Sequence, residues 1–275
     1  MKRKEILTAA IAGAAAALSG PTLAWGGVPN RGKPLTLPGS KRVKVAYAIS
    51  SGATLIDFAG PWEVFGEVMI HSLGATMNEQ MPFDQYLVAK SMDAVETESG
   101  MQVVPGFTFA SAPQPDVLIV GAQPNSAELT AWIQHASRTS AVTASVCTGA
   151  FRVAEAGLFD GLTATTHHAF YDRFEKTFPQ VQLVRDVRYV ENGTVSSAGG
   201  LTSGIDLALR IVERYFGAPI ATSTANYLEY YALHGGHALA PGNRHVAVGQ
   251  VSKEAFPRRE RALRRRHSLP LGVMR

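Results

Sequence analysis

Short apolar segments alternate along the chain with longer segments whose apolar residues recur every three or four positions. A strand that is covered on both faces is apolar at consecutive positions. Strands are therefore predicted within segments 42–50, 83–91, 116–124 and 140–146. Helices are predicted within the longer periodic segments 51–74, 126–138, 148–159, 164–178, 202–217 and 218–233. This alternation predicts an α/β fold in which helices cover both faces of a mostly parallel sheet.

Residue types near the ends of these segments predict where individual elements begin and end. Pro61 suits the first turn of the helix after the first strand, and Gly74 is expected to end that helix. Ser203, with Asp206 three residues further on, is typical of an N-cap with a capping box. The Asn-Gly pair at 192–193 predicts a tight hairpin between two strands.

The two ends of the chain differ in composition from its middle. Residues 1–24 begin with basic residues, continue with 13 apolar residues and end in small residues, which is typical of a cleaved secretory signal. An uncleaved anchor is the alternative, but so short an apolar run spans a bilayer poorly. A linker is expected at 25–41, one domain at 42–235, and a basic, disordered tail at 236–275. We therefore expect a periplasmic or secreted protein with no membrane span after signal cleavage.

The net charge of +4 conceals an acidic middle. Residues 241–275 carry +7 and residues 1–40 carry +4, which leaves −7 on residues 41–240. A nucleic-acid-binding domain needs a basic face on its folded part, so no nucleic-acid partner is expected. The arginine-rich tail is interpreted as a solvated terminus, and contact with an anionic surface is the alternative.

The only cysteine, Cys147, lies between a predicted strand and a Thr-Gly pair that opens a predicted helix. Backbone N–H groups of a first helical turn, here those of Thr148 and Gly149, favour a thiolate and can hold an oxyanion. Gly121 and Ala122, at the end of the neighbouring strand, are expected to add a facing N–H. The geometry resembles a nucleophile elbow. A buried, inert cysteine is the alternative.

Three motifs together resemble one family of α/β proteins. They are LIDFAGPWEVF at 55–65, SVCTGAFRVAEAGLFDGLTATTHHAF at 145–170 and SSAGGLTSGIDLALRIVERYFG at 196–217. In order and spacing they are similar to the DJ-1/PfpI superfamily, above all to its isonitrile hydratase branch and to the amidotransferase-like domain of AraC-type regulators. The resemblance implies a flavodoxin-like three-layer sandwich, a nucleophilic cysteine, no cofactor and a homodimer.

The resemblance also implies roles for single residues. Cys147 matches the family nucleophile, and Thr148 matches the threonine that follows it in the hydratase branch. Asp57 matches the acidic partner of the cysteine, and burial beside the sulfur would raise the pKa of its carboxyl. Its alternative role is to cap the helix that follows. A histidine follows the cysteine in PfpI peptidases, so Thr148 speaks against a Cys-His peptidase.

Four histidines are weighed as further site residues. His167 and His168 are candidate pocket residues, with a structural role as the alternative for both. His168 stands where hydratase-like relatives have tryptophan, which implies a less apolar pocket wall. His234 and His237 have no cysteine or carboxylate at a suitable spacing, so no metal site is predicted.

Two functions are compatible with this site, and both involve a small molecule. The first is a lyase that adds water to an isonitrile and gives an N-substituted formamide through a thioimidate on Cys147. Asp57 would move protons, and Thr148 would steer the water or hold the intermediate. The second is a non-enzymatic ligand-binding or redox-responsive domain that uses the same cysteine pocket. The stretch after the domain is expected to be too short and irregular for a regulator's helix-turn-helix module.

Overall fold

The computed structural model describes residues 32–39 and 42–230. The strands are β1 Val43–Ala48, β2 Phe83–Ala89, β3 Val95–Glu96, β4 Gln102–Val103, β5 Phe107–Thr108, β6 Val117–Val120, β7 Val142–Val146, β8 Thr163–Ala164, β9 Gln182–Leu183, β10 Tyr189–Asn192 and β11 Val195–Ala198. The α-helices are α1 Leu55–Gly66, α2 Met77–Gln80, α3 Ala127–Ser137, α4 Gly149–Glu155, α5 Tyr171–Thr177, α6 Ser203–Phe216 and α7 Ala218–Tyr227. Two 3-10 turns, η1 His71–Leu73 and η2 His168–Phe170, complete the described elements.

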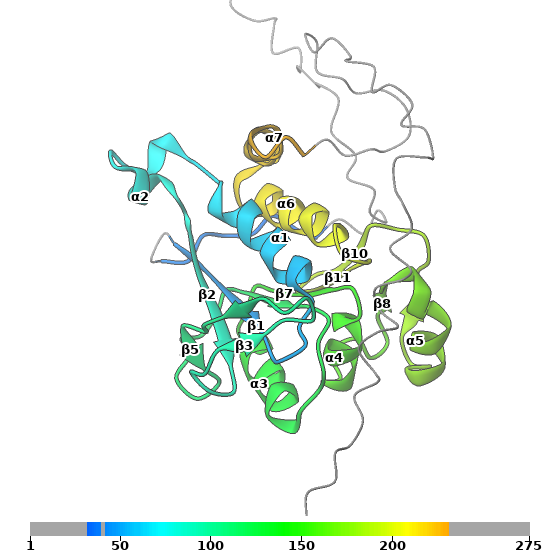
Figure 1. The fold of residues 1–275 in the computed structure, drawn as a ribbon. Coiled ribbons are helices and arrows are strands. Elements are labelled where there is room, and N and C mark those ends of the chain that lie inside the picture. Colours follow the sequence, from blue (N-terminus) through cyan, green and yellow to red (C-terminus); the bar gives the residue numbers. More distant parts are fainter. Residues whose placement is uncertain (1–31, 40–41, 231–275) are drawn as a thin grey trace, which may run out of the picture. The chain divides into compact units, whose positions relative to one another are not determined.

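Seven strands form the main sheet in the order β10-β11-β7-β6-β1-β2-β5. All neighbours in it are parallel except β10 and β11. Helices α1, α6 and α7 lie on one side of the sheet, and α3 and α4 lie on the other (Figure 1). This arrangement is the predicted three-layer sandwich. The parallel strands β1, β6 and β7 have their carboxyl ends on the same side of the sheet. Open α/β sheets bind ligands beyond these carboxyl ends.

The consecutive apolar residues of β1 are explained by burial on both faces of the sheet. Val43, Val45 and Tyr47 belong to the core that contains the apolar residues of α1 and α6. Ala46 and Ala48 belong to the second core, under α3 and α4. Since both faces are covered, the strand has no polar face, and the predicted parallel sheet is confirmed.

The first helix is shorter than predicted. It ends at Gly66, and residues 67–70 lead irregularly into η1 instead of continuing the helix to Gly74. Glycine is a weak helix former, and the β-branched Val68 that follows is fully buried in the core. Pro61 lies inside α1 and not in its first turn, so no N–H is available there for the carbonyl four residues before it.

The predicted cap of α6 is also wrong. The N-cap residue is Thr202, and its side chain makes no capping hydrogen bond. Asp206 is fully buried and accepts hydrogen bonds from Arg188 Nε at 2.6 Å and from the Tyr230 hydroxyl at 3.1 Å. A buried carboxylate needs a partner of this kind, and the sequence motif alone does not reveal a partner outside the helix.

The hairpin predicted at 192–193 is confirmed. Asn192 pairs with Val195 in the antiparallel β10/β11 ladder, and Gly193 has a positive φ of 69°. The tight turn requires this left-handed backbone, which glycine adopts without steric cost.

Part of the predicted linker packs on the domain. Leu35 and Leu37 contact the core, and the Leu35 N–H donates to the Arg214 carbonyl at 2.7 Å. Arg210 Nη2 and Arg214 Nε donate to the carbonyls of Gly32 and Lys33 at 3.2 and 3.0 Å. These described residues of 25–41 therefore belong to the folded unit.

The arginines that hold this segment form a buried ion cluster. Glu191, on β10, is 2% exposed, and its carboxylate lies 2.9 Å from Arg210 Nε and 3.4 Å from Arg214 Nη1. Buried charges persist only when they are paired and hydrogen-bonded. The carbonyls of Gly32 and Lys33 add hydrogen bonds to the two arginines of this cluster.

The predicted signal at 1–24, the whole predicted tail at 236–275, His234 and His237 lie outside the described residues. Among the described helices, none combines the length and the apolar character that a bilayer crossing requires.

Candidate active site

Cys147 lies at the sharp turn between β7 and α4. Its φ is +59°, a left-handed conformation that costs energy for a residue with a side chain. Hydrogen bonds hold both of its backbone groups: its N–H donates to the Gly199 carbonyl at 2.8 Å, and its carbonyl accepts from Thr166 Oγ1 at 2.9 Å. The strained turn is thus fixed by two neighbouring segments, as in a nucleophile elbow.

Close packing of two backbone segments makes this turn possible. A Cβ atom added at Gly149 would lie 2.1 Å from the Val120 carbonyl oxygen and 2.8 Å from the Gly121 carbonyl carbon. Only a residue without a side chain fits at this position. Gly149 therefore has a packing role, which brings the end of β6 against the start of α4.

Gly149→Ala is expected to lower the free energy of unfolding by about 3 kcal/mol, because a Cβ here has to displace backbone atoms. Urea unfolding of the two proteins measures the difference. Gly106→Ala is the matched control, since the nearest atom to a Cβ there is the Leu87 carbonyl oxygen at 3.8 Å. Equal losses in the two variants would contradict the packing argument.

Asp57, in the first turn of α1, is brought to the same edge of the sheet. Its side chain is fully buried, and Oδ2 accepts a hydrogen bond from the Ala122 N–H at 2.8 Å. A Cβ at Gly121 would lie 2.8 Å from the Asp57 Cβ, so glycine is needed there for the approach. The other oxygen, Oδ1, is buried and has no partner of ordinary hydrogen-bond geometry.

The carboxyl of Asp57 and the thiol of Cys147 act on each other electrostatically. Burial raises the pKa of Asp57 to about 7, although the Ala122 N–H and the Cys147 thiol oppose this rise. Burial, and then the negative charge of Asp57, raise the pKa of Cys147 to about 11. The pair therefore rests as a thiol beside a carboxyl that changes protonation around neutral pH.

The resting site therefore holds a thiol, although the first turn of α4 favours a thiolate. The N–H groups of Thr148 and Leu201 do lower the pKa of the Cys147 thiol, as the helix start predicts, but burial outweighs them. Cys147 is only 6% exposed, so the loss of water around a charged sulfur is nearly complete. The sulfur gains its negative charge only when a base removes the proton.

Leu201 is the site residue that the sequence interpretation missed. It follows the Gly-Gly pair after β11 and has a positive φ of 52°, and its N–H contributes to lowering the pKa of Cys147. β11 lies parallel and next to β7, so both strands end at the same edge. The signal was the Gly-Gly pair at 199–200 directly after a strand of small, mostly buried residues.

Ala122 was predicted to offer its N–H to an oxyanion, but this N–H is not available. Its N–H is occupied by Asp57 Oδ2 and holds the carboxyl in place instead. Gly121 and Gly149 act through close packing. Thr148 is half-buried at the N-cap of α4, and its side chain makes no capping hydrogen bond.

His167 and His168 lie beside this site without a hydrogen bond to Cys147 or Asp57 among the described residues. Their rings stack at 4.4 Å, and His167 Nδ1 accepts from the Ala169 N–H at 3.1 Å as the N-cap of η2. Burial, and then His168, lower the pKa of His167. A Cβ at Gly200 would lie 2.2 Å from the His167 ring, so this ring packs on the loop before Leu201.

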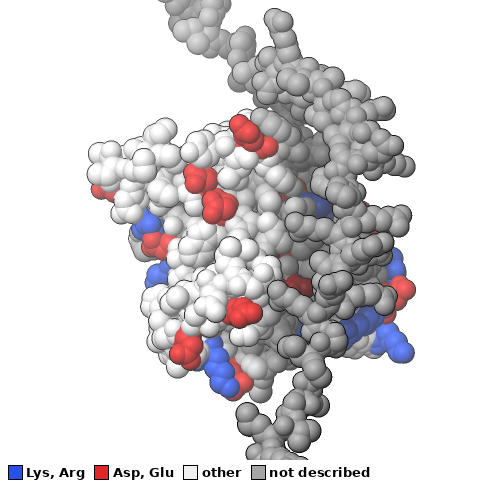
Figure 2. All heavy atoms as spheres, viewed as in Figure 1, with Lys and Arg blue, Asp and Glu red and all other residues white. Residues whose placement is uncertain are grey.

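The described residues contain no group of three or more His, Cys, Asp or Glu side chains that could hold a metal ion. On the face shown in Figure 2, described acidic side chains are scattered from the top to the bottom, and described basic ones lie near the borders. Cys147 and Asp57 are the interacting pair of titratable groups at this site.

Comparisons with known proteins give two kinds of relatives. An isonitrile hydratase from Pseudomonas putida is 28% identical over 197 residues, which cover 68% of this chain and 78% of the hydratase. The HTH-type transcriptional regulator CdhR from Pseudomonas aeruginosa is 31% identical over 97 residues, 35% of this chain and 29% of the regulator. The alignment with the regulator covers less than a third of its length.

Solved structures share the fold. A THiJ/PfpI family protein from Pseudomonas syringae has a TM-score of 0.60 and 25% identity, with 74% of this chain and 79% of that one covered. Drosophila melanogaster DJ-1beta has a TM-score of 0.56 at 15% identity, with 69% and 99% covered, and shows the fold alone. Residues 43–214 match the DJ-1/PfpI family, a span that runs from β1 to the last turn of α6 and includes Asp57 and Cys147. The chain belongs to the DJ-1/PfpI family.

Proposed function

We propose that this protein is an isonitrile hydratase-like lyase, which adds water to R–N≡C to give the formamide R–NH–CHO. The observation that carries the proposal is the buried Cys147 thiol beside Asp57, a carboxyl whose pKa of about 7 suits it to take and give protons near neutral pH. The likeness to the Pseudomonas putida hydratase supports this choice of substrate.

In the first step, the sulfur of Cys147 bonds to the terminal carbon of the isonitrile. The thiol proton passes to the Asp57 carboxylate and from there to the same carbon. The product is the thioimidate R–N=CH–S, in which one carbon has received both sulfur and hydrogen. Asp57 is ionised again at the end of this step.

In the second step, water adds to the thioimidate carbon, and Asp57 relays a proton from the water to the nitrogen. The resulting R–NH–CH(OH)–S intermediate loses its C–S bond and releases the formamide. The hydroxyl proton returns to the sulfur through Asp57, so the thiol and the carboxylate are both restored.

Neighbouring groups support the charge that forms on the sulfur. The N–H groups of Thr148 and Leu201 favour the thiolate as it attacks and as it leaves. The Thr148 hydroxyl is free of a capping bond, so we assign it the orientation of the attacking water. Low exposure at Cys147 keeps bulk water away from the intermediate.

A ligand-binding or redox-responsive domain is the second candidate, and the likeness to part of regulators such as CdhR favours it. Oxidation by peroxide requires a thiolate. The raised pKa of Cys147 leaves little thiolate at neutral pH, which argues against peroxide sensing.

Incubation of the purified protein with a panel of alkyl and aryl isonitriles tests the proposal. The corresponding formamides are expected and are measured by liquid chromatography and mass spectrometry. Spontaneous hydration is subtracted with heat-denatured protein. No formamide from any member of the panel would refute the hydratase, and binding of an isonitrile without turnover would favour the second candidate.

A further inference from the structure

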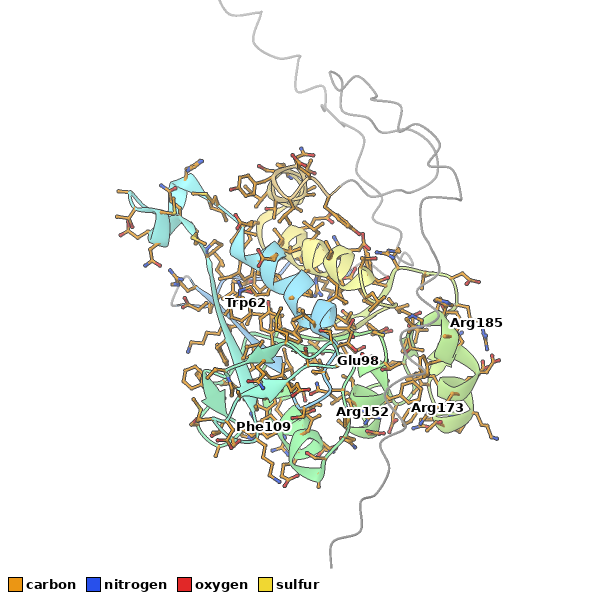
Figure 3. The ribbon with its side chains drawn as sticks, viewed as in Figure 1. Trp62, Glu98, Phe109, Arg152, Arg173 and Arg185 are labelled. Carbon is orange, nitrogen blue, oxygen red and sulfur yellow. The ribbon has the colours of Figure 1, made fainter. Side chains whose placement is uncertain are left out.

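The β3/β4 hairpin is attached to the loop that precedes α1. The Gly52 N–H donates to the Glu96 carbonyl at 2.8 Å, and the Glu98 N–H donates to the Ala53 carbonyl at 3.0 Å. Two backbone hydrogen bonds therefore hold the hairpin beside the first turn of α1, which carries Asp57. Glu98 lies near this end of the helix (Figure 3).

Thr54 joins this hairpin to the reactive pair. It is the N-cap of α1, yet its side chain does not cap the helix, because Oγ1 donates to Glu98 Oε2 at 2.8 Å. Its N–H donates to the Ala122 carbonyl at 2.9 Å, and its carbonyl accepts from the Asp57 N–H at 3.2 Å. Since the Ala122 N–H holds the Asp57 carboxyl, one residue connects Glu98 to both supports of that carboxyl.

Apart from Cys147, Glu98 is the ionisable side chain that acts on the Asp57 carboxyl. Cys147 faces Asp57 from β7, and β6 is wholly apolar. Helix α6 contributes Asp206, which is bound by Arg188 and Tyr230. On β1, Tyr47 donates to Gln85, and on β2, Asp84 accepts from Arg42. The negative charge of Glu98 contributes to the raised pKa of Asp57, after burial.

Glu98 also borders open space. Thr54, Leu55, Ile56, Ala59, Glu98 and Ser99 line a surface cavity of about 490 Å³. The carboxylate of Glu98 is therefore reached by solvent, while the Asp57 carboxyl is fully buried. Changes at Glu98 alter the charge near Asp57 without opening its buried site.

We propose that Glu98 is a positioning residue for Asp57: its hydrogen bond to Thr54 fixes the first turn of α1, and its carboxylate places a negative charge beside the turn that carries the buried carboxyl. The inference rests on the Cys147–Asp57 pair of the proposed function, and not on the isonitrile as substrate. It extends the site to a hairpin that lies about 50 residues before the cysteine in sequence.

The test is the pH dependence of Cys147 alkylation by iodoacetamide, which is neutral and needs no turnover. Intact mass reports Cys147 alone, because the chain has no other cysteine. The wild-type rate is expected to rise near pH 7 as Asp57 becomes able to accept the thiol proton. Glu98→Gln keeps an acceptor for Thr54 but loses the charge, so the midpoint is expected to fall by about 0.5 pH unit. High salt is expected to reduce this difference.

Glu96→Gln is the matched control, because Glu96 is an exposed carboxylate on the same hairpin. Its midpoint is expected to equal that of the wild type. Thr54→Val, which removes the hydrogen bond to Glu98, is expected to shift the midpoint in the same direction as Glu98→Gln, and Thr54→Ser is expected to restore it. Superimposable profiles for wild type and Glu98→Gln, or equal shifts in Glu98→Gln and Glu96→Gln, would overturn the proposal.

The failure of this inference can be told from the failure of the proposed function. A rise near pH 7 that Asp57→Asn abolishes but Glu98→Gln does not move refutes the role of Glu98 alone. A wild-type profile without such a rise refutes both, because Asp57 is then no base for the thiol. The alkylation result does not depend on the formamide assay, because alkylation of Cys147 requires no isonitrile turnover.

Discussion

Cys147→Ser is expected to lower formamide production by about 10⁴-fold or more, because a hydroxyl is a far weaker nucleophile than a sulfur atom and forms no thioimidate. The substitution is small, and a serine hydroxyl can still face Asp57 and the N–H groups of Thr148 and Leu201. The loss therefore reports the chemistry and not the fold. Formamide release at saturating isonitrile, compared with the wild type, measures it.

A second variant, Cys147→Ala, controls for the loss of the sulfur. Cys147→Ala is expected to lose the activity equally, and both variants are expected to give the wild-type circular dichroism spectrum. Rapid acid quenching of the wild type during turnover is expected to show one added isonitrile mass, which neither variant shows. A serine variant that retains a tenth of the rate would mean that the sulfur does not form the bond to carbon.

Asp57→Asn is expected to lower turnover by about 10²–10⁴-fold, since the amide cannot relay protons. Its oxygen can still accept the hydrogen bond from the Ala122 N–H, so the turn is preserved. The alkylation rate of Cys147 is expected to lose its rise near pH 7 and to keep only the rise at high pH. Turnover and alkylation, measured from pH 5 to 10, test both statements.

The same substitution is expected to raise stability above neutral pH. Burial raises the pKa of Asp57 from 3.8 to about 7, so the folded protein binds this proton more tightly than the unfolded chain. The stability contribution is complete below about pH 3.8 and is lost as the pH rises to 7, an effect of about 4 kcal/mol. Asp57→Asn has no such loss.

Thermal unfolding at pH 5 and pH 8 checks this sign. Asp57→Asn is expected to melt at a higher temperature than the wild type at pH 8, and the difference is expected to narrow at pH 5. A variant that is less stable than the wild type at pH 8 would show that the Asp57 carboxylate is stabilised in the fold, contrary to its raised pKa.

The elements of the sandwich were predictable because they depend on local and repetitive features. Strand β6 is apolar at every position and β1 at every position but Lys44, as expected of strands in a sheet covered on both faces. The position of Cys147 between a strand and a Thr-Gly pair was predictable for the same reason. Two residues that meet at one sheet edge, Cys147 and Asp57, came from the family motifs.

Properties that depend on packing between distant segments were not predictable. The protonation of Cys147 is decided by burial, which outweighs the helix start that is visible in the sequence. Leu201 reaches the sulfur because β11 lies next to β7, an order that sequence does not state. Asp206 looked like a cap because its partners, Arg188 and Tyr230, lie outside α6. Each of these three cases concerns a group whose partners come from other elements.

The segment at 32–37 has a consequence for how the chain can be trimmed. Its carbonyls accept hydrogen bonds from Arg210 and Arg214, and Gly32 is so close that a Cβ there would lie 2.6 Å from the Arg214 guanidinium carbon. Cleavage near Ala24 would leave these contacts in place. Cleavage beyond Leu37 would expose two arginines and a glutamate that the fold buries. The folding unit therefore includes Gly32 and begins upstream of the first strand.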